Sequence, residues 1–259
     1  MPESIATPGT IIAVCGKGGV GKTVISAAMV NLLMRNGNNR VLAIDADPAV
    51  GLATALGINT HKTVDDIRLS LIAQLKHGET GDRQAVLSRL DYEMFEALVE
   101  QDNLAFLAIG RPETEGCYCR VNQILKDIIA TLAHHFDYVV IDAEAGIEQL
   151  NRRVLKQVSH LVLVADPSAK ARQVALAIHR LAHQAVDYRH AGLIINRSRD
   201  SRESNALAIP QNLTVLGWVP EDDIIRNWDI QGKSFLDLPA CPALTAVNTC
   251  LQALIEKPV

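Results

Sequence analysis

Eight residues near the amino terminus, Gly16–Thr23, have the types and spacing of a loop that binds phosphate. Their pattern is a glycine, four residues and then Gly-Lys-Thr, which is the Walker A pattern of nucleotide-binding proteins. Glycines let backbone N–H groups approach phosphate oxygens, Lys22 can reach the β- and γ-phosphates, and Thr23 can offer its hydroxyl to Mg²⁺. We therefore expect ATP and Mg²⁺ as cofactors and ATP hydrolysis as the reaction. The residues expected to contact the nucleotide here are Gly18, Gly19, Val20, Gly21, Lys22, Thr23 and Val24.

Two aspartate-containing segments, Asp45–Pro48 and Asp142–Gly146, each follow an apolar run that predicts a buried strand. In sheets of parallel strands, ligands bind at the carboxyl ends of the strands, where these carboxylates would lie. An aspartate at the end of a strand also commonly caps the next helix. Both interpretations stay open for these residues.

A third group of chemically capable residues is the pair Cys117 and Cys119, which follows Gly116 and precedes a helical pattern. A disulfide within this pair would close a very tight ring, so we do not expect one. Two thiolates supply half of a tetrahedral site for a soft metal, and a two-fold dimer would supply the other half. The amino terminus of the following helix would favour the thiolate form. A pair with this spacing also arises by chance, so the spacing alone is a weak indication.

The composition of the chain argues against proteins that bind nucleic acid, bind membranes or are secreted. The chain has 259 residues, of which 48% are hydrophobic and 21% charged, and its net charge is −4. This balance gives no general attraction to nucleic acid or acidic lipid, so we expect no nucleic-acid and no membrane partner. A signal-peptide pattern and an apolar run of ~20 residues are both missing from the sequence, and we expect a cytoplasmic protein. The other cysteines, Cys15, Cys241 and Cys250, are expected to be small buried hydrophobes.

Strand-like and helix-like segments alternate along most of the chain and would position these residues. The strand-like runs are continuously apolar, which is typical of parallel strands with helices on both faces. We therefore predict an α/β fold with a single doubly wound, mainly parallel sheet, forming one P-loop ATPase domain over residues 1–259. The expected strands are Thr10–Cys15, Val41–Asp45, Leu104–Ile109, Tyr138–Asp142, Leu161–Ala165, Ala191–Asn196 and Thr214–Val219. The expected helices are Val24–Met34, Val121–His134, Glu148–Gln157, Lys170–Ala185 and Leu244–Ile255.

Residues 60–103 interrupt this alternation. We expect them to form a helical insertion at the edge of the sheet, with helices over Val64–Lys76 and Arg83–Glu100 and no strand. The polar, aperiodic segment Ser198–Pro210 is expected to be a loop.

The run KGGVGKT, with a second lysine at Lys17, resembles the deviant Walker A motif of the SIMIBI class of P-loop proteins. That class includes the nitrogenase iron protein and the MinD and ParA ATPases. The resemblance implies a homodimer that encloses two ATP molecules, with Lys17 reaching the partner's nucleotide. It also implies that Asp47 orients the attacking water and that Asp142 holds Mg²⁺, directly or through water. The catalytic residues expected from this resemblance are Lys17, Lys22, Asp47 and Asp142.

Two segments near the carboxyl end are similar to the adenine site of the same class. Asn196 resembles the asparagine that binds the base, and Pro220-Glu221-Asp222 resembles the backbone that cradles it. An asparagine at the end of a strand is also commonly only a turn residue.

A narrower resemblance covers nearly the whole chain. GCYCRVNQIL, which contains the cysteine pair, and DAEAGIEQLNRR, from Asp142 to Arg153, are similar to the CooC-type ATPases. That family helps to insert nickel into carbon monoxide dehydrogenase and related nickel enzymes. The resemblance implies that Cys117 and Cys119 hold Ni²⁺ or Zn²⁺ across the dimer, and that the partner is a nickel enzyme.

Two alternatives belong to other function classes. A positioning ATPase of the MinD or ParA kind would need a basic membrane-binding helix or a basic DNA-binding face, and the carboxyl-terminal segment ALTAVNTCLQALIEKPV has one Lys and one Glu. An iron–sulfur electron donor like the nitrogenase iron protein would need a second cysteine near Gly146, and the sequence has none there. We therefore rank metal insertion above both alternatives.

Overall fold

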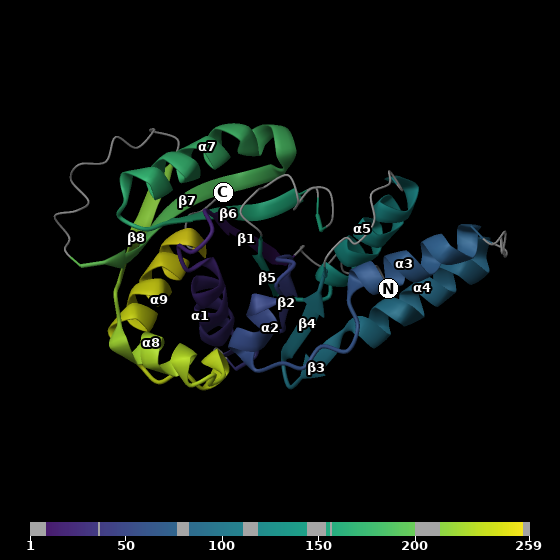
Figure 1. Cartoon of the computed structure of the whole chain (residues 1–259), viewed down its shortest axis with the longest axis horizontal. Coiled ribbons are helices and arrows are strands. Elements are labelled where there is room, and N and C mark those ends of the chain that lie inside the picture. Colours follow the sequence, from purple (N-terminus) through teal and green to yellow (C-terminus); the bar gives the residue numbers. More distant parts are fainter. Residues whose placement is uncertain are drawn as a thin grey trace, which may run out of the picture.

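The computed structural model describes residues 9–35, 37–76, 83–110, 119–143, 154–155, 157–199 and 213–255. Its centre is an eight-stranded sheet in the order β3-β4-β2-β5-β1-β6-β7-β8 (Figure 1). Within these residues the strands pair in parallel except for β3, which runs antiparallel to β4. The predicted α/β class with a mainly parallel sheet is confirmed. The strands are β1 (Thr10–Gly16), β2 (Val41–Asp45), β3 (Val99–Gln101), β4 (Leu104–Ala108), β5 (Tyr138–Asp142), β6 (Gln157–Ala165), β7 (Asp187–Ser198) and β8 (Thr214–Pro220).

Helices cover both faces of the sheet, and the apolar strands explain why. Every residue of β2 and β4 is buried, as expected for strands that pack against helices or loops on both sides. Figure 1 shows α1 and α9 on one face of the sheet and α7 on the other. The helices are α1 (Lys22–Arg35), α2 (Gly51–Leu56), α3 (Val64–Lys76), α4 (Arg83–Ala97), α5 (Cys119–Ala133), α7 (Ala169–Ala185), α8 (Asp223–Ile230), α9 (Pro242–Ile255) and the short 3₁₀ helix η2 (Phe235–Asp237).

The expectation that residues 60–103 contain no strand is wrong. β3 pairs with β4 across a two-residue turn at Asp102 and Asn103, and Asp102 has the left-handed φ of 52°. Aspartate tolerates this conformation, so the chain can reverse there. The strand has only three residues and two of them are exposed, so it lacks the apolar run that marks the other strands. α4 consequently ends at Ala97, whereas α3 has the predicted bounds.

Other differences between the predicted and the observed elements concern short helices and segments that are only partly described. Most of the helix expected over Glu148–Gln157 lies outside the described residues, and Gln157 is instead the first residue of β6. Of the expected loop Ser198–Pro210, the structure describes the first two residues, and Ser198 is the last residue of β7. The helices α2 and α8 were not predicted, because six and eight residues are too few to establish a helical period against their surroundings.

The carboxyl ends of the strands bring the predicted site residues to one edge of the sheet. β1 ends at Gly16, β2 at Asp45, β5 at Asp142 and β8 at Pro220, while Asn196 lies near the end of β7. Asp45 and Asp142 are direct neighbours in the parallel register of β2 and β5. This edge is where doubly wound sheets bind ligands.

Among the described residues, no helix combines the length and the apolar character that crossing a bilayer requires.

Candidate functional site

The loop between β1 and α1 has a backbone that requires glycine. Gly19 and Gly21 have φ values of 82° and 91°, which L residues with a side chain rarely adopt. Gly16 packs against β6 so closely that a Cβ on it would lie 2.3 Å from the carbonyl oxygen of Val164. The glycine pattern of the sequence is therefore explained by the conformation and packing of this loop, which leads directly into α1 at Lys22.

Asn196 fixes the loop from the neighbouring part of the sheet. Its buried side chain donates a hydrogen bond from Nδ2 to the carbonyl oxygen of Val20 at 2.8 Å. A Cβ on Gly21 would lie only 2.4 Å from the same nitrogen atom. The predicted adenine-site asparagine thus already holds the phosphate loop, in addition to any contact that it makes with a base.

The expected base-binding residues line one pocket beside this loop. The pocket has a volume of about 280 Å³ and lies between the start of α1, the ends of β7 and β8, and helices α8 and α9. Its lining includes the predicted residues Gly21, Val24, Asn196, Pro220, Glu221 and Asp222. Apolar side chains such as Ile25 and Val247 form other parts of the wall. A mostly apolar pocket with a few polar groups next to a phosphate loop is suited to a nucleotide base.

Asp222 uses its carboxylate to hold helices rather than a ligand. Its Oδ1 accepts a hydrogen bond from the N–H of Ile224 and caps α8, and its Oδ2 accepts one from the N–H of Ala243 in the first turn of α9. Burial raises the pKa of this carboxyl, but the bonds from Ala243 and Ile224 outweigh that effect and leave the pKa lowered. The carboxylate of Asp222 is therefore occupied by the two helices, and the role of its backbone at a base stays a prediction.

Asp142 is a buried carboxylate with one unsatisfied oxygen. Ser26 donates its hydroxyl to Oδ1 at 3.1 Å, and Oδ2 has no hydrogen-bond partner among the described residues. Burial raises the pKa of Asp142 to about 6, against the opposing effects of Thr23, Lys22 and Ser26. A buried anionic oxygen without a partner, next to the Thr23 hydroxyl, is the donor set that Mg²⁺ prefers. The residues present therefore fit the expected magnesium ion.

Asp45 is a site residue that the sequence analysis did not select. Its Oδ2 accepts hydrogen bonds from the N–H groups of Leu52 at 2.7 Å and Ala53 at 3.3 Å, at the start of α2, and its Oδ1 accepts one from the N–H of Asp47 at 3.1 Å. Burial, and secondly the charge of Asp142, raise the pKa of Asp45 to about 7. For this first aspartate, the helix-capping alternative agrees with the structure. Its position at the end of a buried strand was the available signal.

The segment after Asp45 passes next to Thr23 in a strained conformation. Asp47 is half-buried, and its Oδ1 accepts a hydrogen bond from the N–H of Ala49 at 2.9 Å. Val50 has a φ of 52°, which is unfavourable for a β-branched residue. A methyl group on Gly51 would lie 3.6 Å from the methyl carbon of Thr23. Asp47 is thus held on a short, strained segment directly beside Thr23.

The two lysines of the loop lie close together. Lys22 is buried, and its Nζ donates to the carbonyl oxygen of Lys17 at 3.4 Å. Lys17 is half-buried, and its charge is one of the influences that lower the pKa of Asp166, after burial and the opposing bonds from Ser168. Both predicted lysines are therefore at the phosphate loop, where Lys17 lies near an acidic group of its own chain.

Arg197 is a second residue that the sequence analysis missed. It adopts a φ of 57°, lines the base pocket and donates from Nη1 to the carbonyl oxygen of Gly19 at 3.0 Å. This places a cation over the loop that is expected to bind phosphates. Its position directly after Asn196 was the signal that could have identified it.

Of the two cysteines predicted to bind metal, only Cys119 is among the described residues. Cys117 lies outside the described residues, as do residues 144–153. Cys119 is the first residue of α5, and its side chain is not described. The described residues contain no cluster of three or more side chains able to bind a metal ion. Of the remaining cysteines, Cys15, Cys241 and Cys250 are buried, as predicted.

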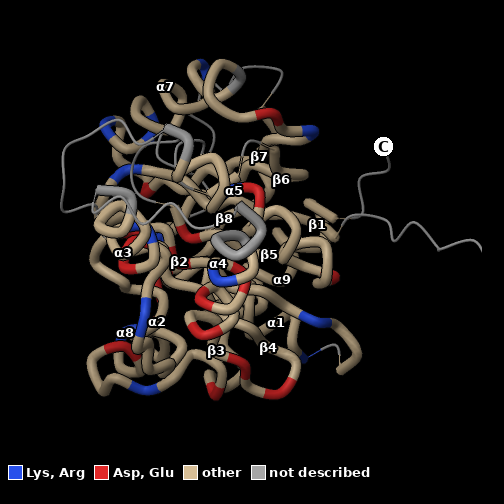
Figure 2. The backbone as a smooth tube through the Cα atoms, turned by 90° about the vertical axis from the view of Figure 1, so that its right-hand side faces the viewer, with Lys and Arg blue, Asp and Glu red and all other residues tan. Residues whose placement is uncertain are grey.

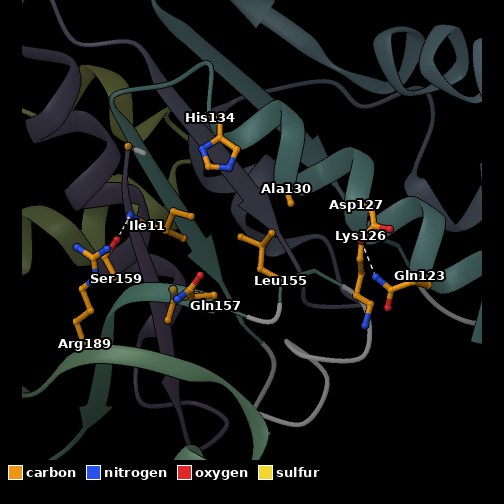
Figure 3. Close-up of a pocket in the computed structure, with 12 residues that line it drawn as sticks. Ile11, Gln123, Lys126, Asp127, Ala130, His134, Leu155, Gln157, Ser159 and Arg189 are labelled. Carbon is orange, nitrogen blue, oxygen red and sulfur yellow. Dashed lines mark hydrogen bonds between the residues drawn. The ribbon is translucent and has the colours of Figure 1, made fainter. Parts of the chain in front are cut away.

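A cavity of about 240 Å³ at the opposite edge of the sheet is separate from these residues (Figure 3). It lies between α5 and the starts of β1 and β6, with Ile11, Leu155 and Val158 in its wall. None of the predicted site residues is part of its lining. The candidate site is therefore the edge that carries the phosphate loop.

Replacing Gly21 by Ala is expected to destabilise the nucleotide-free chain by about 1–3 kcal/mol and to weaken ADP binding, because the new Cβ meets Asn196 and φ is left-handed. Gly18→Ala is the matched control, because a Cβ there has no neighbour within 4 Å. Thermal unfolding and calorimetric ADP titration of both variants would test this. Equal stability of the two variants would contradict the expectation.

Comparison with known proteins agrees with this geometry. A family model described as an AAA domain matches residues 9–187. An uncharacterized ATP-binding protein of Methanocaldococcus jannaschii is 36% identical over 88% of this chain and 91% of its own length. The carbon monoxide dehydrogenase accessory protein CooC of Rhodospirillum rubrum is 30% identical over 95% of this chain and 96% of its own length. The septum site-determining protein MinD of Pyrococcus horikoshii, solved with Mg-ADP, matches with a TM-score of 0.64 and 20% identity over 96% of each chain.

Proposed function

Because the chain belongs to the AAA-domain family of P-loop ATPases, with MinD- and ParA-type ATPases as structural neighbours, we propose that it is an ATP-driven dimer that delivers nickel to carbon monoxide dehydrogenase or a related nickel enzyme. The 30% identity with the accessory protein CooC, nearly end to end, is the observation that carries the proposal. The Cys-x-Cys sequence, whose second cysteine is the first residue of α5, supports it.

The place where β4 ends supports a link between nucleotide and metal. β4 ends beside Asp45 in the sheet register, and the N–H of Ile109 donates to the carbonyl oxygen of Asp45 at 2.8 Å. The chain therefore leaves the sheet at the edge of the phosphate loop, and Cys119 begins the next helix. In this proposal, a change at the segment after Asp45 is transmitted to the cysteines.

In the proposed reaction, the phosphate loop and Lys22 bind the triphosphate of ATP. Thr23 and Asp142 would hold Mg²⁺, which neutralises charge on the phosphates when it is bound. Asp47 orients the attacking water, and Lys17 of each chain reaches the nucleotide of the other chain. Asn196 and the backbone of Pro220–Asp222 hold the base.

In the proposed transport step, Ni²⁺ is the cargo and is held by the thiolates of Cys117 and Cys119 from both chains. A four-thiolate site suits soft and borderline divalent metals, so Zn²⁺ should compete with Ni²⁺. Loss of the γ-phosphate would change the population of closed dimers and separate the two cysteine pairs. The metal could then pass to the nickel enzyme.

The alternatives make different predictions. A positioning ATPase of the MinD or ParA kind would sediment with liposomes or DNA in the presence of ATP. An iron–sulfur electron donor would be brown and would show broad absorption in the visible range. Either result would replace nickel delivery as the proposed function.

The deciding measurement is the metal content per chain after anaerobic loading with Ni²⁺ and desalting, together with the mass in solution. We expect about one metal ion per two chains, because each chain supplies two of four thiolates. The double variant Cys117→Ser/Cys119→Ser should lose this metal. Cys241→Ser, which changes a cysteine near the start of α9, should retain it. Equal metal content in the double variant and the wild type would contradict the proposed metal site at Cys117 and Cys119.

A further inference from the structure

A groove lies between α4 and α5, on the side of the molecule away from α8 and α9 (Figure 1). Its volume is about 530 Å³. The residues from each helix follow the spacing of one helical face, three or four residues apart. The lining consists of Asp91, Met94, Phe95 and Leu98 from α4 and the residue after it, and of Ile124, Asp127, Ile128, Thr131, Leu132 and His135 from α5 and its end.

Helix α4 exposes aromatic surface at the groove and next to it. Phe95 is 65% exposed, and Tyr92 on the same helix is 63% exposed. The chain has only four Phe and four Tyr residues in total, so α4 exposes a considerable part of its aromatic surface. Large apolar side chains that gather at an exposed groove indicate a site for a protein partner.

The charges of the groove are acidic. Asp91 lies on one wall and Asp127 on the other, and the described residues of the lining include no Lys or Arg. Gln123 donates to Oδ1 of Asp127 at 2.5 Å and so orients this carboxylate (Figure 3). Arg89, the nearby cation on α4, is paired with Glu93. Figure 2, which faces this side of the molecule, shows further acidic positions near α4 and β3.

We propose that this groove binds an amphipathic helix of a partner protein, with its apolar face in the groove and Lys or Arg residues along its borders. Two helices with apolar inner faces form the kind of groove that takes a third helix. Basic residues on the bound helix would face Asp91 and Asp127 and would set its orientation.

The groove also lies on the same helix as Cys119. The lining residues of α5 begin five positions after Cys119, which corresponds to roughly 8 Å along a helix axis. A partner bound there would lie on the helix that Cys119 begins. The groove itself does not depend on the metal proposal, but the identification of the partner as the nickel enzyme rests on the proposed function.

A second copy of the chain fits the groove less well than a basic helix. Two such grooves facing each other would bring the acidic borders together, and like charges repel. The later turns of α5 also lead toward the start of β5, away from the edge that carries the phosphate loop. The proposed nucleotide-dependent dimer would use that other edge.

The test uses the full chain and two synthetic amphipathic peptides of about 18 residues with the same leucine face, one bordered by Lys and the other by Glu. Fluorescence anisotropy would measure binding at low salt. We expect the Lys peptide to bind at least about tenfold more tightly than the Glu peptide. Phe95→Ser should weaken its binding at least about tenfold, because it removes an exposed apolar anchor. Leu181→Ser on α7, where the side chain is 53% exposed, is the matched control and should have no effect.

A charge reversal distinguishes the proposed docking mode from non-specific binding of amphipathic peptides. The variant Asp91→Lys/Asp127→Lys should prefer the Glu peptide. Equal binding of both peptides, no binding of the Lys peptide, or no effect of Phe95→Ser would overturn the proposal. Loss of ATP-dependent dimerisation in Phe95→Ser would show instead that the groove joins two copies of the chain. Cys117→Ser/Cys119→Ser should bind the peptides normally, so failure of the groove and failure of the metal site can be told apart.

Discussion

Replacing Asp142 by Asn is expected to abolish ATP hydrolysis and also to stabilise the nucleotide-free chain above pH 7. Hydrolysis should fall at least about a hundredfold, because the variant loses the anionic oxygen proposed to hold Mg²⁺. The nucleotide-free chain should gain about 1–3 kcal/mol at pH 8, because a buried carboxylate with an unsatisfied oxygen is replaced by a neutral side chain. Phosphate release assays and urea unfolding of the same preparations would measure both effects.

The pH dependence gives this prediction its sign. The pKa of Asp142 is raised from 3.8 to about 6, so between about pH 4 and pH 6 the unfolded chain has released a proton that the folded chain keeps. The contribution of Asp142 to the free energy of unfolding therefore falls as the pH rises through this window, and it stays low above it. In Asp142→Asn the free energy of unfolding should not show this fall between about pH 4 and pH 6. Asp47→Asn is the control: it should impair hydrolysis without stabilising the chain, because Asp47 is only half-buried. An Asp142→Asn variant that is less stable at pH 8 would contradict the argument.

The sequence predicted most of what depends on local patterns. Continuous apolar runs marked the parallel strands from β1 to β8, because strands covered on both faces admit few polar residues. The glycine and lysine spacing marked the phosphate loop, since the positive φ values of Gly19 and Gly21 restrict these positions to glycine. Asn196 was selected as a base-binding residue, which stays a prediction, and its hydrogen bond to the phosphate loop was not foreseen.

The features that were missed depend on particular contacts that the pattern of residue types does not show, whether the partners are near or far along the chain. Asp45 reaches across to the start of α2, and nothing in the order of its neighbours shows which backbone groups it accepts from. The contact of Arg197 with Gly19 joins residues 178 positions apart. β3 exists because β4 offers it a free edge and Asp102 permits the turn, not because its own residues favour a strand. Helix α8 likewise depends on Asp222, which also bonds to the start of α9.

A mixture of two inactive variants, Lys17→Ala and Asp142→Asn, is expected to recover hydrolysis. In the proposed dimer, Asp142 acts on the nucleotide of its own chain and Lys17 acts on that of the partner. A mixed dimer would then contain one complete site, built from the phosphate loop and Asp142 of the Lys17→Ala chain and Lys17 of the other. Random pairing gives half mixed dimers with one of two sites complete, so an equal mixture should reach about a quarter of wild-type activity. Phosphate release at constant total protein would measure this.

The position of Lys17 makes the outcome informative. In the single chain, Lys17 lies near Asp166 and its carbonyl oxygen accepts from Lys22, so a role within its own chain is geometrically conceivable. If Lys17 acted on its own nucleotide, a mixed dimer would have one site without Lys17 and one without Asp142, and the mixture would stay inactive. Mixing Lys17→Ala with Lys17→Ala/Asp142→Asn is the matched control, because no chain then supplies the lysine and both interpretations predict no recovery. Recovery only in the first mixture would therefore assign Lys17 to the partner's site and would establish that the two chains share their active sites.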